Sequence, residues 1–273
     1  MNSTVISQAA ANWNSYQLAE ILSHCFEGYL VPFTIDGETF ASRFAAEDMS
    51  LNDSRVWTQD GEPKALAIIS RRGHTSRLAA FAIRPELRGQ GFGKQFMQQL
   101  IDEARARGDR NMWLEVIVGN DSGIALYERM GFVRQQTLVG FNAVSSTLFT
   151  QTGELQEIDP LVMAKKMMTD ADLRLPWLSA AETGYKLPGK AFVLNDMAYA
   201  MIATAPQGFR VRMLYVDPAA RGQGLAKKLL TLLRERFGGL YTATAIPEPL
   251  APVFLSSGYR QDPVTQYEML LKL

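Results

Sequence analysis

Apolar residues recur at helical spacing in two long segments of the chain. A helix that begins near residue 92 and ends at Gly108 would have one apolar face, made of Phe92, Phe96, Met97, Leu100, Ile101 and Ala104. A helix over residues 224–239 would have another, made of Leu225, Leu229, Leu230, Leu233 and Phe237. Each segment follows an apolar run that a proline ends. The pattern predicts two long amphipathic helices in equivalent surroundings.

The remaining signals follow the same order in both halves. The first half has strand signals at residues 5–8, 54–58, 64–70, 75–83, 111–118 and 132–141, and helix signals at 16–26, 36–49 and 121–131. The second half has strand signals at 190–195, 197–205, 209–216 and 239–246, a closing pair of strands at 259–263 and 265–273, and helix signals at 161–168 and 249–258. Asp60-Gly61 is typical of a hairpin turn, and Asp159-Pro160 of a helix start.

The repeated order predicts a duplicated α/β unit, not a short-period solenoid. A chain of 273 residues is long enough for two domains, each with its own core. We place the seam in the polar stretch SSTLFTQTGE, so that the domains are residues 1–146 and 147–273. The last strand of the first copy is hard to locate from the sequence, which makes this boundary the least defined one.

Composition excludes several classes of function. Lys+Arg and Asp+Glu both number 28, so no global field favours nucleic acid or an anionic membrane. Cys25 is the only cysteine and is expected to be a buried small apolar residue, which makes the reducing cytoplasm the expected compartment. With two histidines and no ligand spacing, a metal site is not expected. No stretch approaches the roughly 20 apolar residues that span a bilayer, and the oligomeric state stays open.

Two near-identical hexamers precede the two long helices: RGQGFG at residues 88–93 and RGQGLA at 221–226. A dinucleotide fingerprint and a P-loop both fail on glycine spacing. A plain surface turn explains one copy but not two in the same context. The remaining interpretation is a diphosphate cradle, in which backbone N–H groups converge at a helix N-terminus and glycines allow close approach. Arg88 could add a forked, charged contact to a phosphate.

The hexamers with their flanks, AIRPELRGQGFGKQFM and YVDPAARGQGLAKKLL, closely resemble the acyl-CoA loop of the GNAT superfamily of N-acetyltransferases. The downstream segment NDSGIALYERMGF, residues 120–132, resembles a second motif of that family. The resemblance covers nearly the whole chain. It implies two tandem α/β (α+β) domains, each a mixed, mostly antiparallel central sheet flanked by helices, and acetyl-CoA as the cofactor.

The resemblance also implies a set of binding residues in the first domain. The loop would hold the pyrophosphate of acetyl-CoA, and the strand that ends at Ile83 would pair with the pantetheine and offer an N–H to the thioester oxygen. The residues implied are Phe81, Ala82, Ile83, Arg88, Gly89, Gln90, Gly91, Phe92, Gly93, Lys94, Asn120 and Tyr127. Asn120 would contact the CoA arm, although an N-cap role is the alternative.

Two residues are candidates for proton transfer. The resemblance implies that Tyr127 is the tyrosine that protonates the departing thiolate in many family members. A phenol suits this role, since its reference pKa of about 10 keeps it protonated at neutral pH and able to donate. The alternative for Tyr127 is a place in the core. Glu115 is a candidate base for the attacking amine, and its alternative is an exposed or structurally paired carboxylate. Water is the other route for that proton.

The second copy departs from the family pattern. Phe254 stands at the position of Tyr127 and Pro247 at that of Asn120, so both the phenol and the amide are missing. A second CoA site remains open, with Val216, Arg221, Gly222, Gln223, Gly224, Leu225 and Ala226 as its residues. We expect the first domain to catalyse and the second to be a degenerate partner or a second CoA site.

The function that these patterns favour is transfer of an acetyl group from acetyl-CoA to the primary amine of a small molecule or peptide. Tyr29, Phe33 and Trp57 are candidates for lining the acceptor pocket, with core packing as the alternative. Two other functions stay open: a CoA-binding or sensing module without catalysis, and an acyltransferase that uses a longer acyl-CoA.

Overall fold

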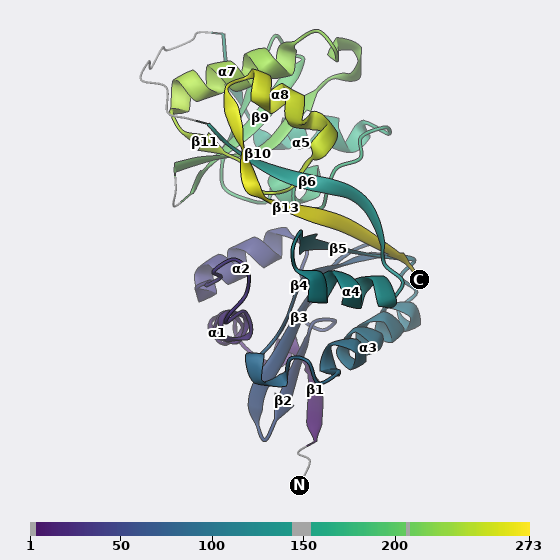
Figure 1. Cartoon of the computed structure of the whole chain (residues 1–273). Coiled ribbons are helices and arrows are strands. Elements are labelled where there is room, and N and C mark those ends of the chain that lie inside the picture. Colours follow the sequence, from purple (N-terminus) through teal and green to yellow (C-terminus); the bar gives the residue numbers. More distant parts are fainter. Residues whose placement is uncertain (1–3, 144–153, 206–207) are drawn as a thin grey trace. The chain divides into compact units, whose positions relative to one another are not determined.

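The computed structural model describes residues 4–143, 154–205 and 208–273 (Figure 1). Its contacts divide the chain into two compact units. Unit 1 consists of Met1–Gln135 and Tyr267–Leu273, and unit 2 consists of Gln136–Gln266. Each unit has its own buried apolar clusters. The boundary expected after residue 146 falls on residues 144–153, outside the described residues.

Unit 1 is built on a mixed, mostly antiparallel sheet. Its strands run in the order β1 (Val5–Ala9), β2 (Arg55–Gln59), β3 (Glu62–Arg72), β4 (Thr75–Ile83), β5 (Asn111–Ile117) and the C-terminal part of β13 (Tyr259–Lys272). The pairs from β1 to β4 are antiparallel, and β4 pairs parallel with β5. The turn between β2 and β3 holds Asp60 and Gly61 at φ of 52° and 81°, which confirms the hairpin signal.

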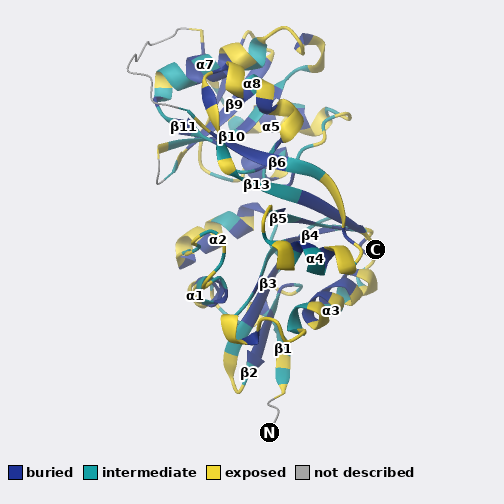
Figure 2. Ribbon diagram, viewed as in Figure 1, coloured by how far each residue is buried: buried dark blue, intermediate teal, exposed yellow. Residues whose placement is uncertain are grey.

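Helices cover both faces of this sheet because successive residues of a strand point to opposite sides. Leu66 and Ile68 of β3 pack in one cluster with α1 (Ser15–Cys25) and α2 (Gly37–Ala46). Ala65, Ala67 and Ile69 pack in a second cluster with α3 (Phe92–Ala106) and α4 (Asp121–Arg129). Figure 2 shows β3 buried along most of its length. The sheet therefore forms the middle layer of unit 1.

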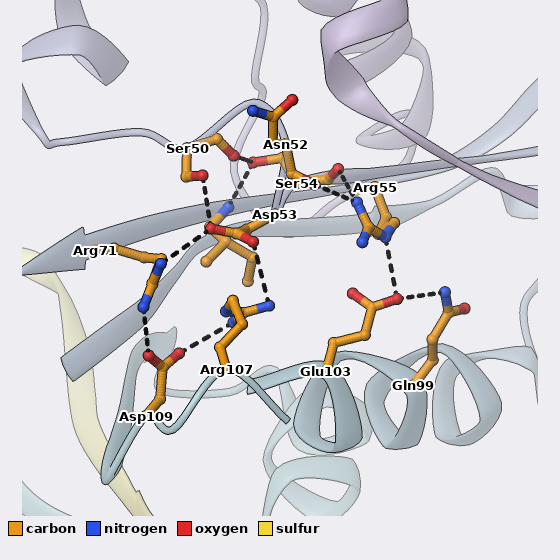
Figure 3. Close-up of polar contacts among 11 residues, drawn as sticks. Ser50, Asn52, Asp53, Ser54, Arg55, Arg71, Gln99, Glu103, Arg107 and Asp109 are labelled. Atoms are coloured by element: carbon orange, nitrogen blue, oxygen red, sulfur yellow. Dashed lines mark hydrogen bonds and ion pairs between the residues drawn. The ribbon is translucent and has the colours of Figure 1, made fainter. Parts of the chain in front are cut away.

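A closed ring of four charges fixes the C-terminal end of α3 (Figure 3). Asp109 is buried and accepts from Arg71 at 2.8 Å and from Arg107 at 3.0 Å. Both arginines also approach Asp53, at 3.5 Å each. Opposite charges thus alternate around the ring, which joins α3 to β3 and to the segment before β2. The other end of α3 carries the first glycine hexamer.

Unit 2 repeats the plan of unit 1. Its strands run in the order β13, β6 (Val133–Ala143), β11 (Leu240–Tyr241), β10 (Gly208–Val216), β9 (Ala198–Ala205), β8 (Lys190–Leu194) and β7 (Gln156–Ile158), and β12 (Ile246–Pro247) also pairs with β6. Its helices are α5 (Pro160–Thr169), α6 (Ala181–Gly184), α7 (Leu225–Phe237) and α8 (Ala251–Ser256). Short 3₁₀ turns lie at Ala10–Asn12, Pro85–Leu87, Pro218–Ala220 and Glu248–Leu250.

Of two local predictions in unit 2, one is confirmed and one is wrong. Asp159 accepts from the N–H of Leu161 and so caps α5, as the Asp-Pro pair predicts. The single strand expected over residues 239–246 is wrong, because that segment forms β11 and β12 separately. Tyr241 pairs with Asn142 and Ile246 with Val139. The segment 241–246 is longer than the part of β6 that it faces, so its middle residues leave the strand.

Candidate functional site

A cavity of about 520 Å³ lies in unit 1 where the first hexamer meets β4 and α4. Three walls surround it. One is the end of β4 with the hexamer, the second is the start of α4, and the third is the segment after α1. The lining residues are Cys25, Phe26, Gly28, Tyr29, Leu30, Phe81, Ala82, Ile83, Leu87, Arg88, Gly89, Gly93, Gly119, Asn120, Asp121, Ser122, Gly123, Leu126 and Tyr127.

The wall from β4 exists because β4 and β5 stop pairing halfway along. Their parallel register runs from Thr75 to Leu78, and no further pair joins the two strands in the described residues. At that point β4 has a bulge at Ala79, where its register with β3 shifts. The segment Phe81–Ile83 therefore keeps backbone groups that an extended ligand could pair with, as an added strand would.

The hexamer presents an open N-terminus of α3 to the cavity. Gly89 and Gly91 adopt φ of 75° and 86°, and a Cβ at either position would meet no atom within 4 Å. Gly91 is the N-cap, and the first N–H groups with an acceptor in the helix are those of Lys94 and Gln95, which donate to the Gly91 carbonyl. The amides before them point out of the helix, where the positive end of its dipole favours an anion.

The side chains of the hexamer hold the loop in shape. Arg88 donates through Nε to the carbonyl of Ile83 at 2.9 Å. Its Nη2 donates to the carbonyls of Cys25 and Glu27, at 2.9 and 2.8 Å. Gln90 donates to the carbonyl of Glu86 at 2.6 Å. Arg88 thus ties the loop to the C-terminal end of α1, where a cation is favourable, and only its Nη1 is not engaged in these bonds.

Asn120 joins two walls of the cavity. Its Oδ1 accepts from the N–H of Gly123 at 3.1 Å, so it caps α4. Its Nδ2 donates to the hydroxyl of Tyr29 at 3.2 Å. Because the Tyr29 oxygen accepts this bond, its own proton is left for another acceptor. Burial raises the pKa of Tyr29, while the bond from Asn120 opposes the rise.

Tyr127 lies on α4 and is 8% exposed. Its ring meets Phe132 edge to face, with centroids 5.9 Å apart. Burial raises the pKa of its phenol, and the neighbouring Tyr29 adds to the rise. Its hydroxyl bonds to no other described residue. The phenol is therefore a protonated donor beside the cavity at neutral pH.

The structure does not bring Glu115 to the cavity. Both of its carboxylate oxygens accept from Nε of Arg77, at 3.0 and 2.8 Å, and Nη2 of Arg77 lies 2.7 Å from Oε2. The same arginine pairs with Glu47 at 2.7 Å. Burial would raise the pKa of Glu47, but Arg43 and Arg77 hold it below its usual value. All this places Glu115 in a buried ion cluster inside unit 1.

Of the three residues expected around the acceptor, only Tyr29 lines the cavity. Trp57 is 1% exposed and stacks on Phe96 with centroids 4.3 Å apart, which places it in the core. Phe33 packs against Phe26 at 4.8 Å, behind the wall. Sequence reasoning missed the other residues of that wall, among them Cys25. Burial raises the pKa of the Cys25 thiol to about 12, so it is no nucleophile.

The second hexamer has the same construction in unit 2. Gly222 and Gly224 adopt φ of 77° and 78°, and Gly224 is the N-cap of α7. Arg221 donates through Nε to the carbonyl of Val216 at 3.1 Å and also pairs with Asp170. Gln223 donates to the carbonyl of Ala219 at 3.1 Å. The loop borders a cavity of about 790 Å³, which Pro247 and Phe254 also line.

Two features are absent from the described residues: a membrane-spanning helix and a metal-binding cluster. No helix among them is long and apolar enough to cross a membrane. Within the same residues no group of three or more His, Cys, Asp or Glu could hold a metal ion.

Comparison with known proteins gives three kinds of match. The model of the acetyltransferase (GNAT) family matches residues 16–132. The [ribosomal protein bS18]-alanine N-acetyltransferase of Escherichia coli (strain K12) is 40% identical over 75 residues, which are 28% of this chain and 51% of that protein. The chain thus spans about half the length of this curated relative.

Solved structures match over almost the whole chain. A GCN5-related N-acetyltransferase from Sphaerobacter thermophilus aligns with a TM-score of 0.69 at 16% identity, covering 98% of this chain and 95% of that one. A tandem GNAT protein from the clavulanic acid biosynthesis pathway aligns with a TM-score of 0.63 at 14% identity, covering 98% of both chains. These likenesses show the fold, including its tandem arrangement.

Proposed function

We propose that the chain is an acetyltransferase of the GNAT family, whose model matches residues 16–132, and that unit 1 transfers an acetyl group from acetyl-CoA to a primary amine. One observation carries this proposal. The cavity of unit 1 brings together an open helix N-terminus, a stretch of β4 that pairs with β3 but, in the described residues, not with β5, and the buried phenol of Tyr127. The helix N-terminus would bind the diphosphate, the stretch of β4 would pair with the extended pantetheine arm, and the phenol would protonate the leaving thiolate.

The residues of the loop fit a diphosphate. The space at Gly89 and Gly91 is open, so a phosphate can approach the amides at the start of α3. The exposed Lys94 in the first turn adds a positive charge. Arg88 acts on this site by positioning the loop, since Nε and Nη2 hold backbone carbonyls. Bound there, acetyl-CoA would supply the acetyl thioester.

The reacting end would lie between β4 and α4. An N–H from the segment Phe81–Ile83 would donate to the thioester oxygen, where negative charge grows as the amine attacks. Tyr127 would donate its proton to the departing sulfur, and its raised pKa keeps that proton in place. Glu115 is held by Arg77, so we assign the proton that the amine loses to water and not to this carboxylate.

Tyr29 would orient the acceptor. Asn120 fixes its oxygen, which leaves its proton for a carbonyl or hydroxyl of the amine substrate. The relative from E. coli is named for the alanine of a ribosomal protein, so a peptide that begins with alanine is the first acceptor to try. Small amines are the second class.

The test is direct transfer. The full chain is incubated with acetyl-CoA labelled in the acetyl group and with a panel of peptides and small amines, and products are identified by mass spectrometry. We expect a mass increase of one acetyl group on an amine nitrogen of at least one acceptor. Saturable acetyl-CoA binding without any acetylated product over the panel would contradict the proposal and favour a binding module.

A further inference from the structure

Unit 1 has a second cavity, to which the proposed function assigns no role. It measures about 350 Å³ and lies between α1 and the hairpin that β2 and β3 form, so we call it the hairpin cavity. Trp13 and residues of α1 form one wall. The turn of the hairpin and Arg84, which follows β4, form the other. A cavity of this volume is large enough for a small molecule.

The polar side chains on the α1 wall have free ends. The carboxylate of Glu20, the imidazole of His24 and the indole N–H of Trp13 make no hydrogen bond or ion pair with any described residue. Gln17 accepts from the N–H of Asn14 at 3.0 Å through Oε1, and its Nε2 donates to nothing in the described part of the chain. The hydrogen-bonding capacity of this wall is therefore available to a ligand.

Arg84 provides a cation on the other wall. Its side chain is 30% exposed, and its Nε lies 3.2 Å from Oε1 of Glu86 in a geometry that gives no hydrogen bond. Its guanidinium donates to no described residue. The nearby Lys64 does not line the cavity and pairs with Glu62 at 2.8 Å and with Glu86 at 3.2 Å. The hairpin cavity thus has a carboxylate, Glu20, on one wall and a guanidinium on the other.

Apolar surface lies beside these two charges. Ile21 is 8% exposed, and it lines the cavity together with Pro63 and the ring of Trp13. Gly61 keeps the hairpin side open, because a Cβ there would meet no atom within 4 Å. An aliphatic or aromatic group that contacts these residues would gain free energy by leaving water. A matching ligand therefore combines an anion, a cation and an apolar group.

From these contacts we propose that the hairpin cavity binds a free α-amino acid with an apolar side chain. Glu20 accepts from the ammonium of the ligand, and Arg84 donates to its carboxylate in a forked contact. The side chain of the ligand packs on Ile21, Pro63 and Trp13. A zwitterion matches both charges of the site, whereas a simple amine or a simple acid leaves one of them without a partner.

The same ligand would act on the first glycine loop. His24 and Arg84 line the hairpin cavity, and their neighbours in the chain, Cys25 and Ile83, line the larger cavity. The carbonyls of these neighbours accept from Arg88, at 2.9 Å each. A ligand that bridges α1 and Arg84 would fix the spacing of the two carbonyls that hold the loop. Amino acid and coenzyme should therefore bind cooperatively. This coupling rests on the proposed function, whereas binding of the amino acid does not.

Binding is tested with the full chain and no coenzyme. Leucine and phenylalanine are titrated by calorimetry, and two analogues of leucine by ligand-observed NMR. The analogue 4-methylpentanoate lacks the amine, and 3-methylbutylamine lacks the carboxylate. We expect saturable binding of both amino acids, and binding of either analogue that is at least about tenfold weaker than that of leucine. If neither amino acid binds, or if leucine and its analogues bind equally well, the proposal is wrong.

Two variants assign the two charges of the ligand. Glu20 is exposed, so Glu20→Gln keeps the fold, and it should weaken leucine binding about tenfold. It should leave the binding of 4-methylpentanoate unchanged, because this analogue has no ammonium. Arg84→Gln should weaken leucine binding by a similar factor and leave that of 3-methylbutylamine unchanged. Glu38→Gln, at an exposed carboxylate of α2 outside both cavities, is the matched control. Leucine binding that neither cavity variant weakens would place the ligand elsewhere and overturn the proposal.

The coupling is measured with coenzyme A, which has no acetyl group to transfer to the amino acid. Coenzyme A should bind about fivefold tighter at saturating leucine, and leucine should bind tighter by the same factor at saturating coenzyme A, because coupling is reciprocal. Unchanged affinities would overturn the link to the loop. If leucine binds as expected but no amine is acetylated, the function of unit 1 falls and the amino-acid site stands. Acetyl transfer by a chain that binds neither amino acid would have the opposite meaning.

Discussion

The two glycine loops of this chain are built alike, whereas the helices that face them differ. In each loop an arginine donates to the carbonyl at the end of the preceding strand, Ile83 or Val216, and a glutamine donates to the preceding turn. The bulge of the strand also lies at matching places, Ala79 in β4 and Arg212 in β10. Both units therefore hold the glycine loop in the same conformation by the same contacts.

The facing helices carry the chemical difference. In unit 1 the edge-to-face pair is Tyr127 with Phe132, and in unit 2 it is Phe254 with Tyr259, at 5.6 Å. The first ring of the pair carries the hydroxyl in unit 1, and the second ring carries it in unit 2. Tyr127 lines a cavity, whereas Tyr259 is 3% exposed and its hydroxyl has no hydrogen-bond partner among the described residues. Equal loops thus do not imply equal chemistry.

The largest expected effect comes from giving unit 1 the ring that unit 2 has. Tyr127→Phe removes the proposed acid and keeps the packing against Phe132, so kcat should fall about 10³-fold. The KM for acetyl-CoA should change less than twofold, because the loop is untouched. Steady-state kinetics with the best acceptor measures both constants.

The double variant Tyr127→Phe/Phe132→Tyr is the control for the exchanged pair. It restores one hydroxyl to the aromatic pair of unit 1, on the ring that carries it in unit 2. Because Phe132 does not line the cavity, activity should stay as low as in Tyr127→Phe. A kcat close to wild type in the single variant would remove Tyr127 from the proposed mechanism.

The second-largest effect should come from backbone strain in the first glycine loop. Gly91→Val puts a β-branched residue at a φ of 86° in front of the amides of α3. We expect kcat/KM for acetyl-CoA to fall about 100-fold, since the cradle is closed and displaced. Gly73→Val is the matched control, at a φ of 56° with equally open space but in the turn between β3 and β4, outside the hexamer. If both variants had a similar kcat/KM for acetyl-CoA, the loop would be a structural turn and not a binding site for the cofactor.

Much of this comparison was predictable because it depends on local signals. The hexamers, the turn at Asp60 and Gly61, and the cap at Asp159 each involve neighbours in the sequence, and the structure has them as expected. The loss of Tyr and Asn from the second copy could be found by spacing alone. The mixed sheet flanked by helices was implied by the resemblance to the GNAT family, and unit 1 has it.

What could not be predicted depends on distant partners. The carbonyls of Cys25 and Glu27 reach Arg88 only once α1 has packed beside the loop, so an arginine expected at a phosphate holds the backbone instead. Glu115 finds Arg77 on the adjacent strand. The last residues of β13 belong to unit 1, although the sequence places them at the end of the second copy.

The anchoring of α3 and of α7 provides a third test. The ring around the buried Asp109 fixes the end of α3, whereas Arg234 on α7 makes one bond of 3.3 Å to the carbonyl of Gly258. Asp109→Ala leaves Arg71 and Arg107 with only the more distant Asp53 of the ring between them, so we expect a loss of about 3 kcal/mol in the free energy of unfolding. Asp102→Ala, at an exposed pair on the same helix, should cost less than about 0.5 kcal/mol. Chemical denaturation followed by fluorescence measures both, and equal losses would argue against the ring.

The smallest expected effect concerns the hydroxyl that unit 2 buries. Tyr259→Phe removes an unpaired polar atom from the core, so the protein should gain about 1 kcal/mol in stability. Tyr127→Phe should give no such gain, because its hydroxyl borders a cavity. Thermal unfolding at neutral pH compares the two variants.

The pH dependence of that gain follows from the same burial. Burial raises the pKa of Tyr259 in the folded protein above its unfolded value of about 10, with Arg234 opposing the rise. The folded state therefore keeps the proton that the unfolded chain loses, and wild-type stability should decrease as the pH rises above about 10. Tyr259→Phe lacks this group, so its advantage should widen between pH 9 and pH 11. If the stability difference between Tyr259→Phe and the wild type stayed constant over that range, the Tyr259 hydroxyl would be hydrated in solution. Tyr259 and Tyr127 would then differ only in their position in the fold.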